Sequence, residues 1–312
     1  MNDMKYKDWL DEWLNLYVKT SVKEKTYTHY LNIVNLHLKP QLGEYDLEEI
    51  KPLILQKYIT ELTHTGNLKT GKGLSANSIN GIIIVIRGSL TMAHNLGFIN
   101  DMVVDKLKRP RMHEKSMECF SLSEQKLIEQ AVLRDKRDKM IGIVLCLYTG
   151  LRLGELLALE WSDADFEKCE ITINKSCYDG RDRDGNYCRI IDTPKTRSSK
   201  RTIPFPKQLL PLLKEVKKRS LSTYIISDKG KIVTIRSYQR SFELFLRKLK
   251  IEHRGFHALR HTFATRAIEC GMDVKSLSEI LGHKDPTITL KRYVHSLMVH
   301  KREYINRLGK LL

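Results

Sequence analysis

The chain has 312 residues, of which 41% are apolar and 29% are charged. This composition excludes an intrinsically disordered chain and is sufficient for one or two hydrophobic cores, with two domains as the expectation for this length. The 54 Lys and Arg residues outnumber the 37 Asp and Glu residues and leave a net charge of +17. An excess of this size favours a polyanionic partner, with nucleic acid ahead of a membrane surface.

The sequence has no targeting or membrane-spanning pattern. It lacks an apolar run of about eighteen residues, and its beginning, with Asp3 and Asp8, does not resemble a signal peptide. We therefore expect a soluble, cytoplasmic protein. Six scattered cysteines without a CxxC pair argue against a disulfide framework and against a zinc ribbon.

The charge is divided unevenly along the chain. Residues 1–110 hold 14 basic and 12 acidic residues, whereas residues 111–312 hold 40 and 25, which gives +2 and +15. Residues 106–115 (KLKRPRMHEK) combine five basic residues with a proline, as is typical of a solvated linker. We expect a first domain over residues 1–105, a linker over 106–116 and a second domain over 117–312.

The first domain is predicted to be all-helical. Apolar residues recur at helical spacing, no segment has the alternation of a strand, and a polar cap at Ser75 precedes the last helix. The predicted helices cover residues 5–18, 23–36, 47–62 and 75–95.

The second domain is predicted to be mainly helical with a small sheet. Helices are expected over 121–132, which starts with a capping box, and over the buried stretch 138–148. Three short segments rich in Ile, Thr and Tyr predict a three-stranded antiparallel sheet from residues 170–178, 187–193 and 201–205. Helices resume after Pro206, with Gly271 and Gly282 as stops.

Three motifs in this domain carry residues suited to chemistry on a phosphate. In TGLRLGELLAL, a turn at Gly150 places Arg152 at a helix start, and Glu155 three residues later can orient its guanidinium. In HALRHTFAT, His257 and Arg260 share a helical face, an arrangement that taken alone is typical of a solvated helix. In LGHKD, His283 follows a glycine, and Tyr293 lies ten residues further on.

The order and spacing of these motifs resemble the signature of the tyrosine recombinases, the family of phage and conjugative-transposon integrases. The resemblance spans essentially the whole chain and is strongest over residues 146–293. It implies a two-domain clamp around duplex DNA, with a helical core-binding domain and a catalytic domain. It also implies integration or excision of a mobile element such as a transposon or phage.

The resemblance assigns the catalytic roles. Arg152 and Arg260 match the two arginines that hold the scissile phosphate, His257 and His283 match the family histidines, and Tyr293 matches the nucleophile. A lysine in a turn of the small sheet is the remaining catalytic group, for which Lys195 is the candidate and Lys200 a rival; Tyr304 is the alternative nucleophile. Glu155 is a supporting residue.

Elementary chemistry supports these roles. Displacement at a phosphodiester builds charge on the phosphate oxygens, and fixed arginines can stabilise it without a metal ion. A tyrosine with an ordinary pKa of about 10 needs nearby cations and a proton acceptor, here His257, to become a nucleophile at neutral pH. A lysine such as Lys195 can protonate the leaving sugar oxygen. We expect no metal and no other cofactor.

Contacts to DNA are expected from polar groups in the first domain and from the linker. The candidates are helix-start residues and exposed linker cations: Lys23, Lys25, Thr26, Asn77, Asn80, Lys106, Lys108, Arg109 and Arg111. The helix-start residues could equally be plain caps on solvated faces.

Further partners follow from the family resemblance. The amphipathic tail after Tyr293 is expected to dock on a neighbouring protomer within a homotetramer assembled on paired double-stranded DNA sites. A small excision factor is a further candidate partner, and no membrane is expected. Integrases of mobile elements often carry an additional N-terminal arm-binding domain, and none is recognised before Lys5.

Three alternatives remain open. Histidines at positions 253, 257 and 261 suggest a metal hydrolase, although Ala258 stands where an H-E-x-x-H site needs glutamate. A DNA-binding protein that has lost catalysis would keep the fold. A type IB topoisomerase would use the same chemistry, and relaxation of supercoiled DNA without sequence preference would favour it.

Overall fold

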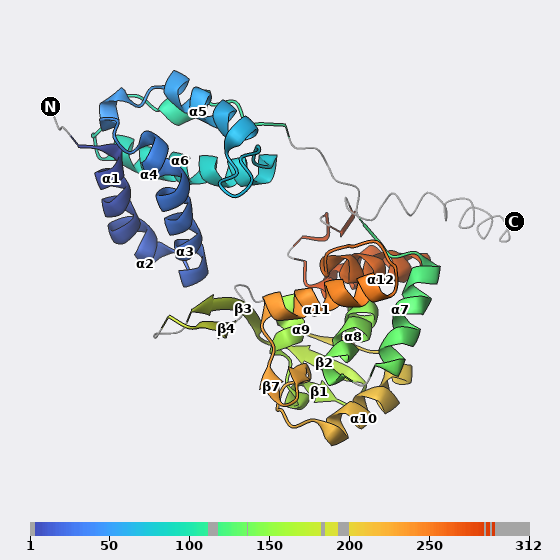
Figure 1. The fold of residues 1–312 in the computed structure, drawn as a ribbon. Helices are drawn as coiled ribbons and strands as arrows, with labels where there is room; N and C mark the ends of the chain where they lie inside the picture. Colours follow the sequence, from blue (N-terminus) through green and yellow to red (C-terminus); the bar gives the residue numbers. More distant parts are fainter. Residues whose placement is uncertain are drawn as a thin grey trace, which may run out of the picture. The chain divides into compact units, whose positions relative to one another are not determined.

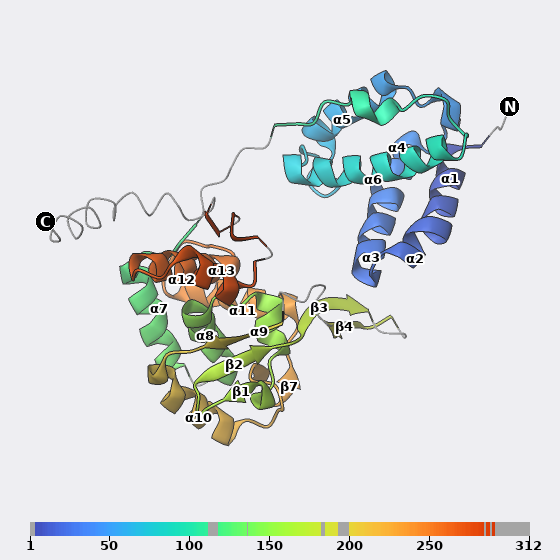
Figure 2. The same cartoon turned by 180° about the vertical axis from the view of Figure 1, so that it is seen from behind.

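The computed structural model describes residues 4–111, 118–135, 137–181, 185–192, 200–283, 285–287 and 289–290. The chain forms two compact units, Met1–Lys115 and Ser116–Leu312, which Figures 1 and 2 show from opposite sides. Each unit is described by itself below. No helix in the described ranges is both long enough and apolar enough to cross a membrane.

The first unit is helical, as predicted, and within residues 4–111 the extended pairing is confined to one bridge between Lys5 and Asp46. Two long helices each contain a π-helical segment, and two α-helices and two short 3₁₀ turns follow them (Figure 1). The elements are α1 Tyr6–Trp13, η1 Leu14–Val18, α2 Lys19–Ser21, α3 Glu24–Ile33, η2 Val34–Leu38, α4 Lys39–Leu42, η3 Leu47–Glu49, α5 Pro52–Thr65, α6 Ala76–Asn95 and η4 Val103–Lys106.

Two predicted helix boundaries in this unit are wrong by five residues or more. The second helix does not end at Leu36 but continues through η2 and α4, because the wider π turn just before Pro40 accommodates a residue that has no N–H to donate. The third helix does not begin at Leu47 but at Pro52, since a proline suits the first turn and holds Lys51 extended. The predicted last helix is confirmed, with Ser75 accepting a hydrogen bond from the Ser78 N–H at 3.2 Å.

The core of the first unit lies where α1 packs against α6 and α3. Tyr6 and Ser89, both fully buried, join their hydroxyls at 2.8 Å, and the Trp9 indole donates to the Ser89 carbonyl at 3.0 Å. The ring of Trp13 stacks on that of Tyr30 at 6.1 Å. These uncharged contacts hold α1 against α6 and α3.

The second unit packs helices around α8, whose side chains are buried on nearly every side, as its sequence predicts. In Figure 2 helices α7, α12 and α13 lie on one side of the small sheet, and α10 lies at its far edge. The helical elements are α7 Leu122–Arg134, η5 Asp138–Met140, α8 Ile141–Thr149, α9 Leu153–Ala158, η6 Trp161–Asp163, η8 Lys207–Leu209, α10 Leu210–Arg219, α11 Ile235–Lys248, α12 His257–Glu269 and α13 Val274–Leu281.

A three-stranded antiparallel sheet is present, but its predicted membership is wrong. Strands β1 (Ala164–Asp165), β2 (Glu170–Ile173) and β5 (Arg201–Pro204) form this sheet in the order β1-β2-β5. Strands β3 (Ser176–Arg181) and β4 (Tyr187–Asp192) form a separate hairpin that projects from the unit in Figure 1, and β6 (Ser227–Asp228) pairs with β7 (Lys231–Ile232).

The predicted single strand over residues 170–178 breaks at Asn174 and Lys175. The Lys175 ammonium lies 2.8 Å from a Glu160 carboxylate oxygen and 3.4 Å from one of Asp163, so this residue is held outside the ladder. The chain therefore leaves β2 and starts the β3–β4 hairpin, while β5 takes the free side of β2 with Ile171 opposite Ile203.

Candidate active site

A left-handed turn places Arg152 at the start of α9. Gly150 ends α8 with φ of +64°, a conformation that side chains with a Cβ rarely adopt. A Cβ at this position would also lie 2.5 Å from Cδ1 of Phe263. Arg152 then occupies the N-cap position of α9, as the sequence predicts.

Glu155 holds Arg152 through two contacts. Its carboxylate accepts hydrogen bonds from Nη1 of Arg152 at 2.8 Å and from the Arg152 backbone N–H at 3.0 Å. Burial of the Glu155 carboxyl opposes its ionisation, but the hydrogen bonds and charge of Arg201, together with the charge of Arg152, outweigh burial and lower the pKa of Glu155 to about 2. Glu155 is therefore an ionised, buried anchor.

Arg201 belongs to this cluster and was not singled out in the sequence. From β5, its Nη1 and Nη2 donate to the two oxygens of Glu155 at 3.1 and 2.9 Å, and its Nε donates to the Ile280 carbonyl at 2.6 Å. One available signal was strand alternation: Arg201 lies two residues before the buried Ile203, so both side chains point to the same face. A charge on that inner face needs a buried partner.

Arg260 is buried rather than on a solvated helix face. Only 2% of the residue is exposed, although it lies on α12 in a motif whose spacing alone suggests a surface pair. Its Nη1 donates to the Gly150 carbonyl at 2.7 Å and its Nη2 to the Leu281 carbonyl at 2.7 Å. The same Nη2 lies 3.0 Å from Nε2 of His283.

The contacts of His283 define its ring orientation and tautomer. Because a guanidinium only donates, Nε2 of His283 accepts from Arg260. The proton then resides on Nδ1, which lies 2.7 Å from the hydroxyl of the fully buried Thr289. The ring is thus held between α12 and the short segment that follows α13.

The turn from Leu281 to His283 brings the two candidate arginines together. Nη2 of Arg152 donates to the Gly282 carbonyl at 3.0 Å, next to the Leu281 carbonyl that accepts from Arg260. Gly282 adopts φ of +63°, and a Cβ there would lie 2.8 Å from Nη1 of Arg201. Glycine is needed at this position because three arginines approach the same turn.

The remaining predicted catalytic residues are placed only in part. His257 is the first residue of α12, is exposed, and lies edge-on to the His261 ring with centroids 4.5 Å apart. Lys200 is exposed just before β5. Lys195, Tyr293, the alternative Tyr304 and the C-terminal tail lie outside the described residues. In the described ranges, no three His, Cys, Asp or Glu side chains lie close enough to hold a metal ion.

The candidate DNA-binding residues of the first unit occur on two neighbouring helices. Lys23 and Lys25 are exposed at the start of α3 with Thr26 half-buried, and Asn77 is exposed at the start of α6 with Asn80 half-buried. The helices approach closely at Gly81, where a Cβ would lie 4.0 Å from Nε2 of His29. Lys25 lies one helical turn before His29, and Asn77 one turn before Gly81.

The basic segment after α6 is attached to the first unit over its first residues. Lys106 ends η4, and the backbone N–H of Lys108 donates to the Gln56 side chain at 2.9 Å. The side chains of Lys106, Lys108, Arg109 and Arg111 are exposed. The segment is thus hydrogen-bonded to α5 at Lys108 and carries exposed cations before and after that contact.

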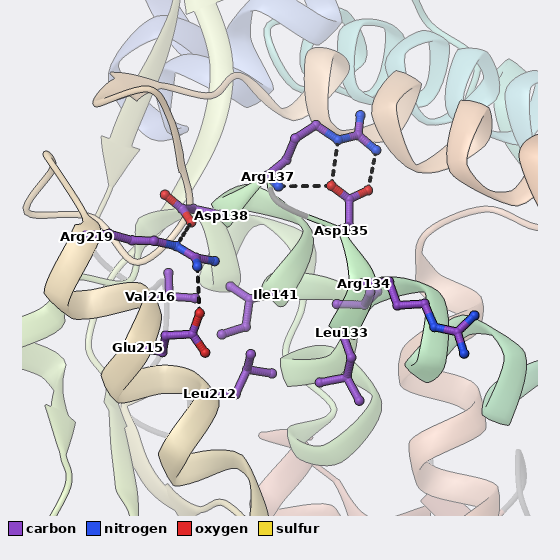
Figure 3. Close-up of a pocket in the computed structure, with 11 residues that line it drawn as sticks. Leu133, Arg134, Asp135, Arg137, Asp138, Ile141, Leu212, Glu215, Val216 and Arg219 are labelled. Atoms are coloured by element: carbon purple, nitrogen blue, oxygen red, sulfur yellow. Dashed lines mark hydrogen bonds and ion pairs between the residues drawn. The ribbon is translucent and has the colours of Figure 1, made fainter.

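A separate pocket of about 510 Å³ lies between α7, η5 and α10, away from these residues (Figure 3). Most of its charged lining is internally paired: Arg219 contacts Asp138 at 2.6 Å and Glu215 at 2.7 Å, and Arg137 contacts Asp135 at 2.6 Å. None of the predicted catalytic residues lines it.

Comparison with known proteins agrees with the geometry. Residues 123–300 match the model of the phage integrase family. The chain belongs to the phage integrase family. Residues 5–63 of this integrase also match the SAM-like N-terminal domain of phage integrases.

Relatives of the integrase include recombinases and integrases. A XerC-like tyrosine recombinase of Caldanaerobacter subterraneus subsp. tengcongensis is 30% identical over 99% of this chain and 84% of the relative. The ICEBs1 integrase of Bacillus subtilis is 26% identical over 93% of this chain and 79% of its own length. The chain is therefore a site-specific tyrosine recombinase that acts on DNA.

Solved structures share the fold. The Tn1549 transposon integrase, solved as residues 82–397 with a circular intermediate DNA, has a TM-score of 0.81 at 22% identity and covers 98% of this chain and 99% of its own. A lambda integrase dimer bound to a core site has a TM-score of 0.71 at 18% identity, covering 94% and 78%. These likenesses confirm the predicted fold class of a mainly helical chain with small antiparallel sheets.

Proposed function

We propose that this integrase cleaves one DNA strand by attack of Tyr293 on a phosphodiester held by Arg152 and Arg260. The observation that supports this most strongly is the convergence of both guanidinium groups on the carbonyls of Gly282 and Leu281. Residues distant in sequence are held with their cationic ends at one turn, and the side chain of Arg152 remains 38% exposed. Such fixed cations suit the charge that develops on phosphate oxygens.

The remaining roles complete the reaction. His257 accepts the phenol proton of Tyr293, and His283, hydrogen-bonded to Arg260, contributes to the phosphate site. Lys195 protonates the departing 5′ oxygen, so that cleavage gives a 3′-phosphotyrosyl ester and a free 5′-hydroxyl. The 5′-hydroxyl of a partner strand then displaces the tyrosine. Because the ester conserves the energy of the broken bond, the cycle needs neither ATP nor a metal ion.

We propose double-stranded DNA with paired recombination sites as the partner. Lys23, Lys25, Thr26, Asn77 and Asn80 form a polar surface on α3 and α6 that supports contact with phosphates and base edges. The exposed cations Lys106, Lys108, Arg109 and Arg111 would add sequence-independent contacts to the backbone.

The proposed assembly is a homotetramer on DNA. The amphipathic tail of each protomer docks on its neighbour and couples the active sites, and a small excision factor directs the reaction toward excision. The solved lambda integrase tetramer bound to a Holliday junction is a relative of the same fold that supports this assembly.

Covalent coupling to DNA tests the proposed chemistry. Native protein and Tyr293→Phe are incubated, in EDTA, with duplex DNA from the ends of the mobile element that encodes the chain, and SDS-resistant adducts are quantified. The native chain should form the adduct, and Tyr293→Phe should bind the duplex without forming it. Tyr304→Phe is the matched control and should couple normally; coupling lost in Tyr304→Phe but kept in Tyr293→Phe would move the nucleophile to Tyr304.

A further inference from the structure

The second unit contains a third arginine at the site whose side chain is almost closed to solvent. The side chain of Arg201 is 8% exposed, compared with 38% for Arg152. All three of its side-chain nitrogens donate inside the unit, to both oxygens of Glu155 and to the Ile280 carbonyl. Arg201 therefore links β5, α9 and α13, the elements that surround the turn at Gly282.

The charge of Arg201 resolves a conflict in the Arg152–Glu155 pair. A carboxylate that orients an arginine also cancels much of the arginine's charge, which would weaken its attraction for a phosphate. Here Glu155 faces two guanidinium groups, so the charge of Arg201 balances that of the carboxylate. The three residues together carry a net charge of +1. Arg152 can then be held by Glu155 and still act as a cation.

The contact with Ile280 gives Arg201 a second task. The Ile280 carbonyl lies two residues before Gly282, whose carbonyl accepts from Arg152. Gly282 leaves the space that the guanidinium of Arg201 needs, because a Cβ at that position would lie 2.9 Å from Cζ of Arg201. A shift of Arg201 would therefore displace at once the two groups that hold the guanidinium of Arg152, the Glu155 carboxylate and the Gly282 carbonyl.

We propose that Arg201 is a positioning residue for strand cleavage: it compensates and orients Glu155 and fixes the turn after α13, so that Arg152 presents an uncancelled charge to the phosphate. This inference rests on the proposed cleavage reaction. We assign Arg201 a positioning and not a catalytic role, because it acts through Glu155 and the Ile280 carbonyl, to which its guanidinium donates.

The test compares cleavage by Arg201→Gln and Arg201→Lys with that of the native chain. The readouts are the rate of SDS-resistant coupling to the same end DNA, the affinity for that DNA, and the melting temperature. The control is Arg219→Gln, which removes an arginine paired with the carboxylates of Asp138 and Glu215 at the separate pocket (Figure 3). Glu155→Gln and the double variant Glu155→Gln/Arg201→Gln complete a double-mutant cycle.

Arg201→Gln should slow coupling by about 10²-fold with DNA affinity nearly unchanged, because displacement of a positioned group by about an ångström has effects of this order. Arg201→Lys should recover about tenfold of that loss, since it restores the charge but not the paired hydrogen bonds. Arg219→Gln should couple at the native rate. In the Glu155→Gln background, the Arg201→Gln change should cost clearly less than about 10²-fold, because the charge of Glu155 is already gone and only the part of the loss that comes from the Ile280 contact remains.

Two results would overturn the proposal. One is coupling by Arg201→Gln within about threefold of the native rate, and the other is a loss of equal size with and without the Glu155→Gln change. If Arg201→Gln does not fold, the coupling rate of the double variant is compared with that of Glu155→Gln alone. The double variant lacks both members of the Arg201–Glu155 ion pair, so neither is left buried without its partner. Failure of the native chain to couple would instead reject the proposed cleavage reaction, before any variant is compared.

Discussion

The two units stabilise their interiors by different means. Among the described residues, the first unit buries one polar residue outside its aromatic side chains, the neutral Ser89, whereas the second buries Arg260, Glu155 and Lys139. Buried ions cost desolvation energy that their partners repay only when the geometry is good. The core of the second unit therefore carries a desolvation cost that the first unit avoids. The same buried ion pairs hold cations in fixed positions where a phosphate is proposed to bind.

The contrast shows that burial has opposite purposes in the two halves. In the first unit, burial of Tyr6, Trp9 and Trp13 stabilises a scaffold for exposed polar residues. In the second, burial of Glu155 and Arg260 removes the freedom of side chains that would otherwise be mobile in water. Preorganisation of this kind lowers the cost of stabilising a transition state.

The largest expected effect is loss of the buried anion. Glu155→Ala leaves the 8% exposed side chain of Arg201 without its carboxylate. We expect the second unit to lose about 3–5 kcal/mol of unfolding free energy, while the first unit is unchanged. Chemical denaturation followed by amide hydrogen exchange reports each unit separately.

The isosteric Glu155→Gln is the control for that prediction, because it removes the charge without leaving a cavity. An equal loss of stability in both units, or a loss below about 1 kcal/mol in the second, would contradict the contrast between them.

The second largest expected effect is a greater loss of stability in the second unit than in the first at low pH. The pKa of Glu155 is about 2 in the folded protein against an ordinary 4.5, so its stabilising contribution is complete above pH 4.5 and disappears as the pH falls from there toward 2. A difference of this size corresponds to about 3 kcal/mol at neutral pH. Hydrogen exchange corrected for its intrinsic pH dependence should show the second unit opening first.

The first unit also has a carboxyl group with a lowered pKa, that of Glu44, but its contribution to stability is weaker. The hydrogen bond and charge of Lys7 lower the pKa of Glu44, but the Glu44 side chain is 78% exposed, so solvent screens the pair. If the first unit were to open at the higher pH, the assignment of acid sensitivity to the Glu155 cluster would be wrong.

The smallest effect concerns the neutral core of the first unit. Ser89→Ala leaves the buried Tyr6 hydroxyl without its partner at 2.8 Å, and we expect a loss of about 1–2 kcal/mol confined to this unit. Thermal unfolding of the full chain with hydrogen exchange measures it. The double variant Tyr6→Phe/Ser89→Ala should recover most of the loss, since it removes both polar groups; a double variant less stable than Ser89→Ala would contradict this account.

Local features of the sequence determined much of the fold and part of the site. The helix caps at Ser75 and Ser121, the turns at Gly150 and Gly282, and the pair of Arg152 with Glu155 depend on residues within about four positions of one another, so spacing alone predicts them. The family motifs extended this prediction to Arg260 and His283. The roles of Lys195 and Tyr293 stay predictions.

Features that depend on contacts between residues far apart in the sequence were determined only by the tertiary structure. The break at Lys175, the pairing of β5 with β2 and the burial of Arg260 depend on residues that meet only after folding. Arg201 is the clearest case: it begins a short strand, and its significance comes from Glu155 and Ile280, which lie far from it in sequence. Sequence periodicity indicates which face of a strand turns inward, but only packing determines which charge that face meets.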